Sequence, residues 1–381
     1  MRGWPAAAAL LAVLLSVACS QDVPKPANAD LVIAVDAPLT GPQGPQGQAV
    51  VNAVNAVVAG EFRGRVVGLP VRVTLFDESV NQRRDPGQGE RNVRMMLRDP
   101  HLVGVIGPLN SDVAVSEIAV ANPAHLALIS PSASHPCLTR NAASCGDLAA
   151  ELRPSGSNDF FRLVPSDDGK GAALLEYART TLHLTRFAVA SDSQPAGKAV
   201  AESFEAAARR RGGNINIRRD LDLASDQAID GFLAAAKAGG AEAVFVGGDQ
   251  EGGACRVRAR MKGLLDAATL FLAAGNVHGA ACLRDAGPLA AGMYTADSGP
   301  ADLVESSRLA ARVLMRAMSD GVKGAGGNAP TREEVRAAIS RSSNPAFDSH
   351  GDLRDQTFTI DRSDATPVWA AAGQVTVPSA G

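Results

Sequence analysis

Short runs typical of buried strands alternate along the chain with segments whose apolar residues recur at helical spacing. The runs that predict strands lie at residues 30–40, 71–79, 102–109, 126–130, 186–193, 243–250 and 269–275. Helical spacing predicts helices at residues 49–62, 87–99, 110–125, 199–212, 228–240, 254–265, 301–321 and 331–342, and a late β-hairpin is expected over 347–361. Repeated strand–helix alternation is the pattern of a parallel sheet covered by helices. Because the alternation runs twice and 381 residues exceed one ordinary core, we expect an α/β protein with two lobes.

The first 29 residues have the pattern of a targeting segment. Arg2 precedes an apolar stretch from Ala6 to Val17, which is short for a membrane span and typical of a secretion signal. The string SVAC resembles the bacterial lipobox, in which the cysteine, here Cys19, is lipidated, although Ser16 stands where that motif prefers Leu. We therefore expect a signal peptide over 1–18 and a lipidated, flexible tether over 19–29, which would hold the exported chain on the cell envelope. The alternative is an ordinary secretory signal with a chance cysteine.

Four cysteines remain beyond the lipobox. An even number in an exported chain favours two disulfides. Cys137 and Cys145 flank one short loop, and Cys255 with Cys282 is the natural second pair. The alternative, a zinc site, lacks both CxxC spacing and neighbouring histidine pairs.

Composition and motifs argue against nucleic-acid binding and against catalysis. A net charge of −3 gives no basic footprint, and 4% aromatic residues leave few rings on which bases could stack. The sequence has no GxSxG, no HExxH, no Walker-type phosphate loop and no GxGxxG after a strand. We therefore expect a chain that is not an enzyme and that has no cofactor, no metal and no nucleic-acid partner.

A series of short strings in a fixed order resembles a known family. The strings are the TGP loop, FDES, VIGPLNS, ISPSAS, FRLVPSDDGKG, FAVASDSQPAGK, VFVGGDQEG and FDSHGD. Over residues 30–375 their order is similar to that of type I periplasmic binding proteins of the branched-chain amino-acid (Leu/Ile/Val) class. The resemblance implies two Rossmann-like parallel-sheet lobes that close on a ligand in the manner of a Venus flytrap.

The same resemblance implies where the chain passes between the lobes. Three crossing strands are expected near Val164–Ser166, Ala296–Ser298 and Ala346–Asp348. The first lobe would then comprise residues 30–164 and 297–345, and the second lobe residues 165–296 and 346–375.

Resemblance to the amino-acid binders also implies a cradle for the ligand carboxylate in the first lobe. Asn110 and Ser111 would contribute from one loop, and Ser132, Ala133 and Ser134 from another, with Ala133 presenting its backbone. Hydroxyl groups at helix N-termini suit a small anion, because unpaired N–H groups and the helix dipole both favour negative charge. The alternative is that these serines only cap helices and turns.

The second lobe departs from the family pattern. The acidic residue that pairs with a ligand ammonium is replaced by Gly275 followed by Asn276, and two aromatic positions hold Gln46 and Asp249. Asn276 and Gln46 are therefore candidate contacts of a changed kind. A buried ammonium needs a carboxylate partner, so Asp249 is the candidate replacement and Glu251 a weaker one. If neither faces the cleft, we expect a ligand that is not an α-amino acid.

These expectations combine into one function. The chain would be an extracytoplasmic substrate-binding lipoprotein of an ABC transporter that captures a small polar solute, an amino acid or a related carboxylate or amide, for a membrane permease. The alternative is a membrane-anchored sensing module that signals to a partner receptor. A third hypothesis, a hydrolase that uses Ser132, is disfavoured because a serine without a positioned base is not nucleophilic.

Overall fold

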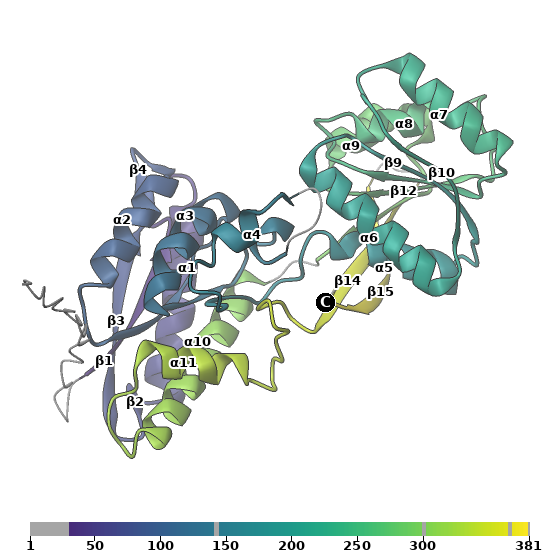
Figure 1. Ribbon diagram of the computed structural model, residues 1–381. Helices are drawn as coiled ribbons and strands as arrows, with labels where there is room; N and C mark the ends of the chain where they lie inside the picture. Colours follow the sequence, from purple (N-terminus) through teal and green to yellow (C-terminus); the bar gives the residue numbers. More distant parts are fainter. Residues whose placement is uncertain (1–29, 141–144, 299–301, 365–367, 380–381) are drawn as a thin grey trace, which may run out of the picture.

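The computed structural model describes residues 30–140, 145–298, 302–364 and 368–379, and the predicted signal segment and Cys19 lie outside them. Figure 1 shows two α/β lobes joined by a narrow connection. The first lobe contains the N-terminal elements together with two helices from residues beyond 300, so the chain returns to it after building the second lobe. This confirms the predicted fold class.

The first lobe is built on a six-stranded sheet. Its order is β2 (Arg65–Val66), β3 (Leu69–Asp77), β1 (Leu31–Ala37), β6 (Leu102–Ile106), β7 (Ala127–Ser130) and β8 (Phe160–Arg162). All neighbouring pairs are parallel except the short β2–β3 pair. Every residue of β1 is buried, as expected for a strand that is covered by helices on both faces.

Alternate residues of β1 enter two separate cores. Leu31, Ile33 and Val35 pack into one core, and Val32 and Ala34 into the other, because successive side chains of a strand point to opposite faces. The first core is closed by α1 (Gly44–Asn55), a π-helical turn η1 (Ala56–Glu61), α10 (Leu303–Gly324) and α11 (Arg332–Ser340). The second core is closed by α2 (Pro86–Met96) and α3 (Ser111–Ala121), with the short α4 (Leu148–Glu151) nearby.

The second lobe is built on a seven-stranded sheet. Its order is β10 (Asn214–Asp220), β9 (Arg186–Ser191), β11 (Ala243–Gly247), β12 (Leu270–Ala274), β13 (Met293–Asp297), β14 (Asp355–Ser363) and β15 (Trp369–Pro378). The first five strands are parallel to one another, and β14 runs antiparallel to both of its neighbours, β13 and β15. Helices α5 (Gly169–Thr180) and α6 (Pro195–Arg211) cover one face, and α7 (Asp226–Ala238), α8 (Ala254–Arg260) and α9 (Ala280–Ala286) cover the other.

The remaining described elements are short. Two strands of two residues each, β4 (Ser79–Val80) and β5 (Arg83–Arg84), form a small hairpin. Short 3₁₀ helices lie at η2 (Asn122–Ala124), η3 (Pro136–Leu138) and η5 (Gly287–Leu289). The strand β10 is not among the predicted elements. The predicted hairpin over 347–361 lies later in the chain, because β14 pairs with β15.

The last return to the second lobe also comes later than the predicted residue 346. Phe347 is 1% exposed and packs in the core of the first lobe, edge to face with Phe161. Asp352 is buried among arginines of the first lobe, with its Oδ1 2.6 Å from the Nε of Arg162. Burying this ring and pairing this charge holds the segment before β14 against the first sheet.

Candidate functional site

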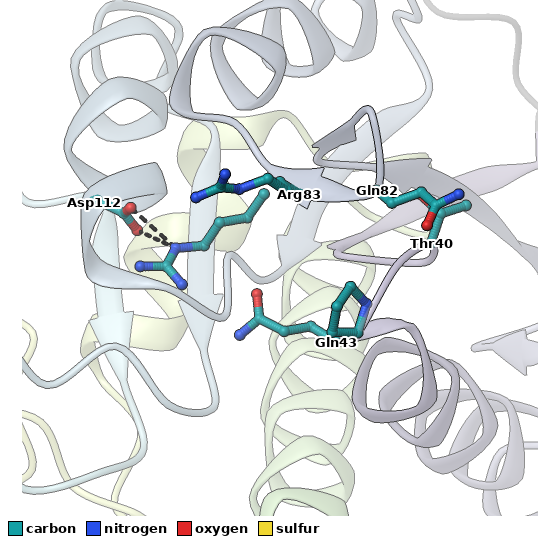
Figure 2. Close-up of a pocket in the computed structure, with 7 residues that line it drawn as sticks. Thr40, Gln43, Gln82, Arg83 and Asp112 are labelled. Atoms are coloured by element: carbon teal, nitrogen blue, oxygen red, sulfur yellow. Dashed lines mark hydrogen bonds and ion pairs between the residues drawn. The ribbon is translucent and has the colours of Figure 1, made fainter.

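A hollow of about 330 Å³ lies on the first lobe beside the β4–β5 hairpin (Figure 2). Its lining includes Thr40, Gln43 and Arg84, and the Nε of Arg84 donates to both carboxylate oxygens of Asp112 at 3.1 and 3.0 Å. All its lining residues belong to the first lobe.

A larger cleft of about 470 Å³ lies between the lobes. Its lining from the first lobe is Ser134 and His135, and Asp167 belongs to the adjoining crossing segment. The second lobe contributes residues from the carboxyl ends of its strands and from the starts of α5 and α6: Lys170, Ala196, Gly197, Val200, Gly248, Asp249, Gly275, Asn276, His278, Ala296 and Asp297. Open α/β sheets bind ligands outside the carboxyl ends of their strands, so this cleft is the candidate site.

The serine loop after β7 is organised by its own hydrogen bonds. The buried Ser130 hydroxyl donates to the Pro108 carbonyl oxygen at 2.7 Å and accepts from the N–H of Ala133 at 2.9 Å. The Ser132 hydroxyl donates to the Leu109 carbonyl oxygen at 2.7 Å. These bonds fix the loop against the loop that precedes α3.

The structure brings only part of the predicted cradle to the cleft. Ser134 lines it, and its hydroxyl donates to the Oδ2 of Asp167 at 2.8 Å. Ser111 is half-buried behind it, where its hydroxyl accepts the N–H of His135 at 3.3 Å. Ala133 is 1% exposed, and its N–H donates to the Ser130 hydroxyl inside the loop instead of pointing into the cleft. Ser132 is not among the lining residues either.

Two further predicted residues lie away from the cleft. Asn110 precedes α3, and its side-chain amide donates to the Oε1 of Glu78 at 3.0 Å inside the first lobe. Gln46 lies exposed on α1 and lines no part of the cleft. Both residues are predicted from their positions in the loops that follow strands. Gln46 instead belongs to the first turn of α1 and points to solvent.

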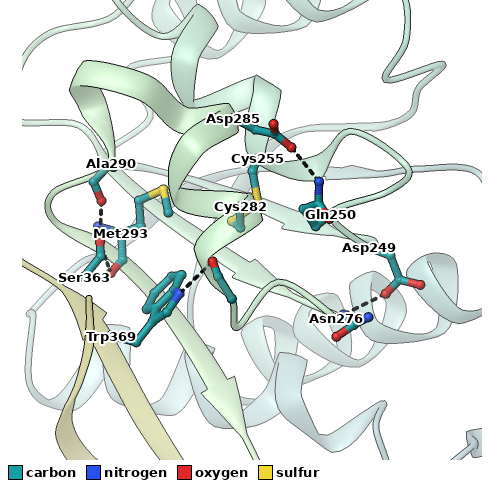
Figure 3. The surroundings of a disulfide bond; sticks show 11 residues. Asp249, Gln250, Cys255, Asn276, Cys282, Asp285, Ala290, Met293, Ser363 and Trp369 are labelled. Atoms are coloured by element: carbon teal, nitrogen blue, oxygen red, sulfur yellow. Dashed lines mark hydrogen bonds between the residues drawn. A yellow bond between two sulfur atoms is a disulfide. The ribbon is translucent and has the colours of Figure 1, made fainter. Parts of the chain in front are cut away.

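The predicted residues of the second lobe do reach the cleft. Asp249 follows β11 and Asn276 follows β12, and the Oδ1 of Asp249 accepts the Asn276 N–H at 2.7 Å (Figure 3). Gly275, with φ of +145°, allows the two loops to touch, since a Cβ there would lie 2.4 Å from the Gly248 carbonyl oxygen. Glu251 is exposed and does not line the cleft.

Three charged side chains at the cleft, those of Asp167, Lys170 and Asp297, are not among the residues predicted from the sequence. Lys170, in the first turn of α5, has a side chain only 12% exposed, and its Nζ lies 2.8 Å from the Oδ1 of Asp167. Burial alone would lower the pKa of Lys170, but Asp167, and then Asp297 and Asp249, raise it above its ordinary value. The ammonium of Lys170 therefore stays charged. Asp167 is its direct partner, and the charges of Asp297 and Asp249 also act on it. The string DDGK marks this helix start, but no sequence signal places it at the cleft.

His135 is not arranged as a catalytic base for Ser134. Its Nδ1 accepts the N–H of Cys137 at 3.2 Å, and the Ser134 hydroxyl is engaged by Asp167. Burial lowers the pKa of His135, against a smaller opposing effect of Asp167. The serine–histidine neighbours thus form no nucleophile–base pair.

Both predicted disulfides are present. Cys137 is joined to Cys145 next to the serine loop, and Cys255 to Cys282, which links α8 to α9 beside the cleft loops (Figure 3). Within the described residues, no helix is long and apolar enough to cross a membrane.

Comparison with known proteins identifies the family. A family model described as periplasmic binding protein matches residues 30–312. The chain belongs to this family. A family of binding proteins agrees with the expectation that the chain is not an enzyme.

Individual relatives of this periplasmic binding protein are distant. The Leu/Ile/Val-binding protein BraC3 of Rhizobium johnstonii is 27% identical over 229 residues, which cover 60% of this chain and 57% of that protein. The Leu/Ile/Val-binding protein homolog 3 of Brucella melitensis is 28% identical over 229 residues. The alignment thus spans little more than half the length of these curated relatives.

A solved structure shares the whole architecture. An ABC transporter substrate-binding protein from Desulfitobacterium hafniense has a TM-score of 0.64 and 17% identity, and the match covers 90% of this chain and 100% of that one. At this identity the likeness shows the fold alone.

Proposed function

We propose that this periplasmic binding protein is the substrate-binding component of an ABC transporter, and that it captures a small polar solute with an ammonium group, such as an amino acid. The observation that carries the proposal is the cleft between the lobes, whose carboxylates outnumber its cations. The names of the curated relatives, Leu/Ile/Val-binding proteins, support an amino-acid ligand, and the name of the Desulfitobacterium protein supports the transport role.

The charges of the cleft favour a cationic group on the ligand. Asp167 is already paired with Lys170 at 2.8 Å. Asp249 and Asp297 remain, and in the described part of the chain no lysine or arginine side chain forms a salt bridge with either. A ligand ammonium held between them would satisfy both the ligand charge and these carboxylates.

The other end of such a ligand would lie beside Lys170, at the start of α5 and close to the edge of the first lobe. Lys170 has donors to spare beyond Asp167. A carboxylate or amide placed there would accept from the Lys170 ammonium. Apart from two imidazoles, the lining contains no aromatic ring, and its apolar side chains are Ala196, Val200 and Ala296, so a compact polar solute suits it better than a large apolar one.

Capture would work by differential affinity for the closed form. A ligand that contacts Ser134 of the first lobe and Asp249 of the second lobe bridges the cleft, and it can do so fully only when the lobes approach. Such a ligand shifts the population toward the closed form. A membrane permease would then recognise the closed form, while lipidated Cys19 would keep the protein at the cell envelope.

The test is a thermal-shift and calorimetric screen of the purified protein. Each amino acid is offered beside the carboxylic acid that has the same side chain but lacks the ammonium. At a ligand concentration of 100 Kd, binding to the folded state adds about 2.7 kcal/mol of stability. We expect at least one amino acid to raise the melting temperature, and its ammonium-free analogue to fail.

Asp249→Asn is the variant that checks the ammonium contact. Loss of one hydrogen bond to a charged group costs about 1.5–3 kcal/mol, so the affinity should fall about 10-fold to 150-fold. Glu251→Gln, two residues away and outside the lining, is the matched control and should bind as the wild type does. A shift produced only by carboxylates or amides would contradict the ammonium contact, and no shift with any solute would favour a sensing module for a protein partner.

A further inference from the structure

Three carboxyl groups from three different elements meet inside the first lobe, away from the cleft. Asp36 lies near the carboxyl end of β1, Glu78 directly follows β3, and Glu117 belongs to α3. Each side chain is 0% exposed, and one carboxylate oxygen of each lies within 4.8 Å of the others. We call Asp36, Glu78 and Glu117 the acidic triad.

Two amides orient two members of the acidic triad. The side-chain amide of Asn92 donates to the Oδ1 of Asp36 at 3.0 Å and to the Asp77 carbonyl oxygen at 3.0 Å. The side-chain amide of Asn110 donates to the Oε1 of Glu78 at 3.0 Å. In each carboxylate one oxygen is therefore held and the other, Oδ2 of Asp36 and Oε2 of Glu78, has no hydrogen-bond partner. This is how amides position carboxylates around metal ions.

Glu117 reaches the same point independently. It projects from a helix rather than a strand end, and neither of its oxygens has a hydrogen-bond partner although the side chain is fully buried. The neighbouring α2 leaves room for it at Gly89, where a Cβ would lie 2.7 Å from the Oε1 of Glu117 and 2.6 Å from a methyl carbon of Val113. A buried carboxyl without a protein donor is costly, so another group must satisfy it.

No protein cation performs that task within the described residues. The triad takes part in no salt bridge, and the nearby Arg84 is held by Asp112 at 3.0 Å. Four carboxylate oxygens of the triad have no hydrogen-bond partner, and three oxygens, one from each residue, lie within 4.8 Å of one another. An all-oxygen, anionic set of this kind is the preferred environment of Mg²⁺, Ca²⁺ and Mn²⁺ rather than of zinc or copper.

We propose that Asp36, Glu78 and Glu117 bind one hard divalent cation, with Asn92 and Asn110 as positioning residues. The cation would neutralise the triad and tie the end of β1 and the start of the β4–β5 hairpin to α3. Because Asn110 immediately precedes Ser111, an occupied site would also fix the loop at the start of α3.

The hollow of Figure 2 lies close to the triad. Gln43 lines that hollow, its side-chain amide donates to the Oδ1 of Asn110 at 3.4 Å, and the Asn110 amide donates to the Oε1 of Glu78 at 3.0 Å. Two side chains therefore connect the hollow to the triad, and we expect an ion to enter from this side.

The alternative occupant is protons. Burial, and then the charge of neighbouring carboxylates, raises the pKa of Asp36 and of Glu117 well above their ordinary values. Protonated carboxyls could bond to one another without a metal. A metal titration separates the two occupants.

The experiment is calorimetric titration of the full protein, stripped with a chelator, with CaCl₂, MgCl₂ and MnCl₂ in turn near neutral pH. We expect saturable binding of at least one ion at one site per chain. Glu117→Gln keeps the shape and removes one ligand charge, and we expect it to weaken that binding at least about tenfold. Glu90→Gln, an exposed glutamate of α2 paired with Arg94, is the matched control and should leave binding unchanged.

Either of two results would overturn the proposal. If the wild-type protein shows no saturable binding of any of the three ions, the triad binds no cation and its carboxyl groups are satisfied by protonation instead. Binding that survives unchanged in Glu117→Gln would place the ion elsewhere. If Glu117→Gln does not fold, the wild-type titration still decides the first point, and Asn92→Ala, expected to weaken binding about 10-fold to 100-fold, decides the second. No solute is added, so the outcome is separate from that of the transport proposal.

Discussion

Asp352 shows how one buried charge joins distant parts of the chain. Its Oδ1 lies 2.6 Å from the Nε of Arg162 and its Oδ2 accepts from the Nε of Arg140 at 2.8 Å, all within the first lobe. Burial alone would raise the pKa of Asp352, but Arg162 and then Arg140 lower it to about 2, from an ordinary value of 3.8. Protonation thus favours the unfolded chain, so this contribution to stability is complete above about pH 4 and is lost as the pH falls toward 2.

This gives a prediction for Asp352→Asn. The variant keeps the shape of the side chain but leaves the buried guanidinium of Arg162 without its counter-charge and Arg140 with only Asp348, at 3.6 Å. Breaking this buried pairing should cost about 3–5 kcal/mol of the free energy of unfolding at neutral pH. Urea unfolding between pH 2 and pH 6 measures both effects. The wild type should lose part of this difference as the pH falls, so the two curves should converge. A difference that stays constant over this range would contradict the assigned pKa.

For the residues of the cleft, the sequence predicts those in loops after strands better than the charged side chains that lie beside them. Ser134, Asp249 and Asn276 could be predicted because each follows a recognisable strand, and the carboxyl ends of parallel strands meet at one edge. Lys170 could not, because it reaches the cleft only through the packing of α5 on the second sheet. Asp297 could not either, because the resemblance places residues 296–298 in a crossing segment, whereas Asp297 ends the sheet strand β13. The acidic triad could not be predicted for a related reason. Metal-binding motifs have ligands close together in the sequence, whereas residues 36, 78 and 117 come together only when α3 packs on the sheet.

The two disulfides constrain elements of different span. Cys255–Cys282 encloses a sequence separation of 27 residues between α8 and α9, and Cys137–Cys145 encloses only 8. Loop-closure entropy predicts stabilisation of about 3.5 kcal/mol for the longer loop and about 2.5 kcal/mol for the shorter. Replacing each pair by alanines should therefore destabilise the protein more for Cys255 and Cys282. Urea unfolding of the two double variants tests the order, and the reverse order would show that lost packing outweighs chain entropy.

Element boundaries were predictable where burial was complete and less so at edges. The strands β1, β6, β7 and β11 are buried along their whole lengths, and their apolar runs marked them plainly. β10 is an edge strand in which Ile215 and Ile217 alternate with polar residues and arginines follow, so its pattern resembles a loop. The segment before β14 was assigned to the wrong lobe because Phe347 and Asp352 find their partners only in the folded molecule.

At the scale of the whole molecule, the proposed function requires the two lobes to move together on binding a ligand. The cleft of about 470 Å³ is lined from both lobes, and one ligand would bridge Ser134 of the first lobe and Asp249 of the second. We expect an amino acid that binds to reduce the radius of gyration measured by small-angle X-ray scattering, because the bridged state is the closed one. The Asp249→Asn variant should reach the same closed radius at a ligand concentration about 10-fold to 150-fold higher, as the lost charged contact weakens affinity without altering the hinge. Glu251→Gln should follow the wild-type curve. Saturating ligand that leaves the radius unchanged, while calorimetry still records binding, would contradict closure as the mechanism of capture without contradicting the site.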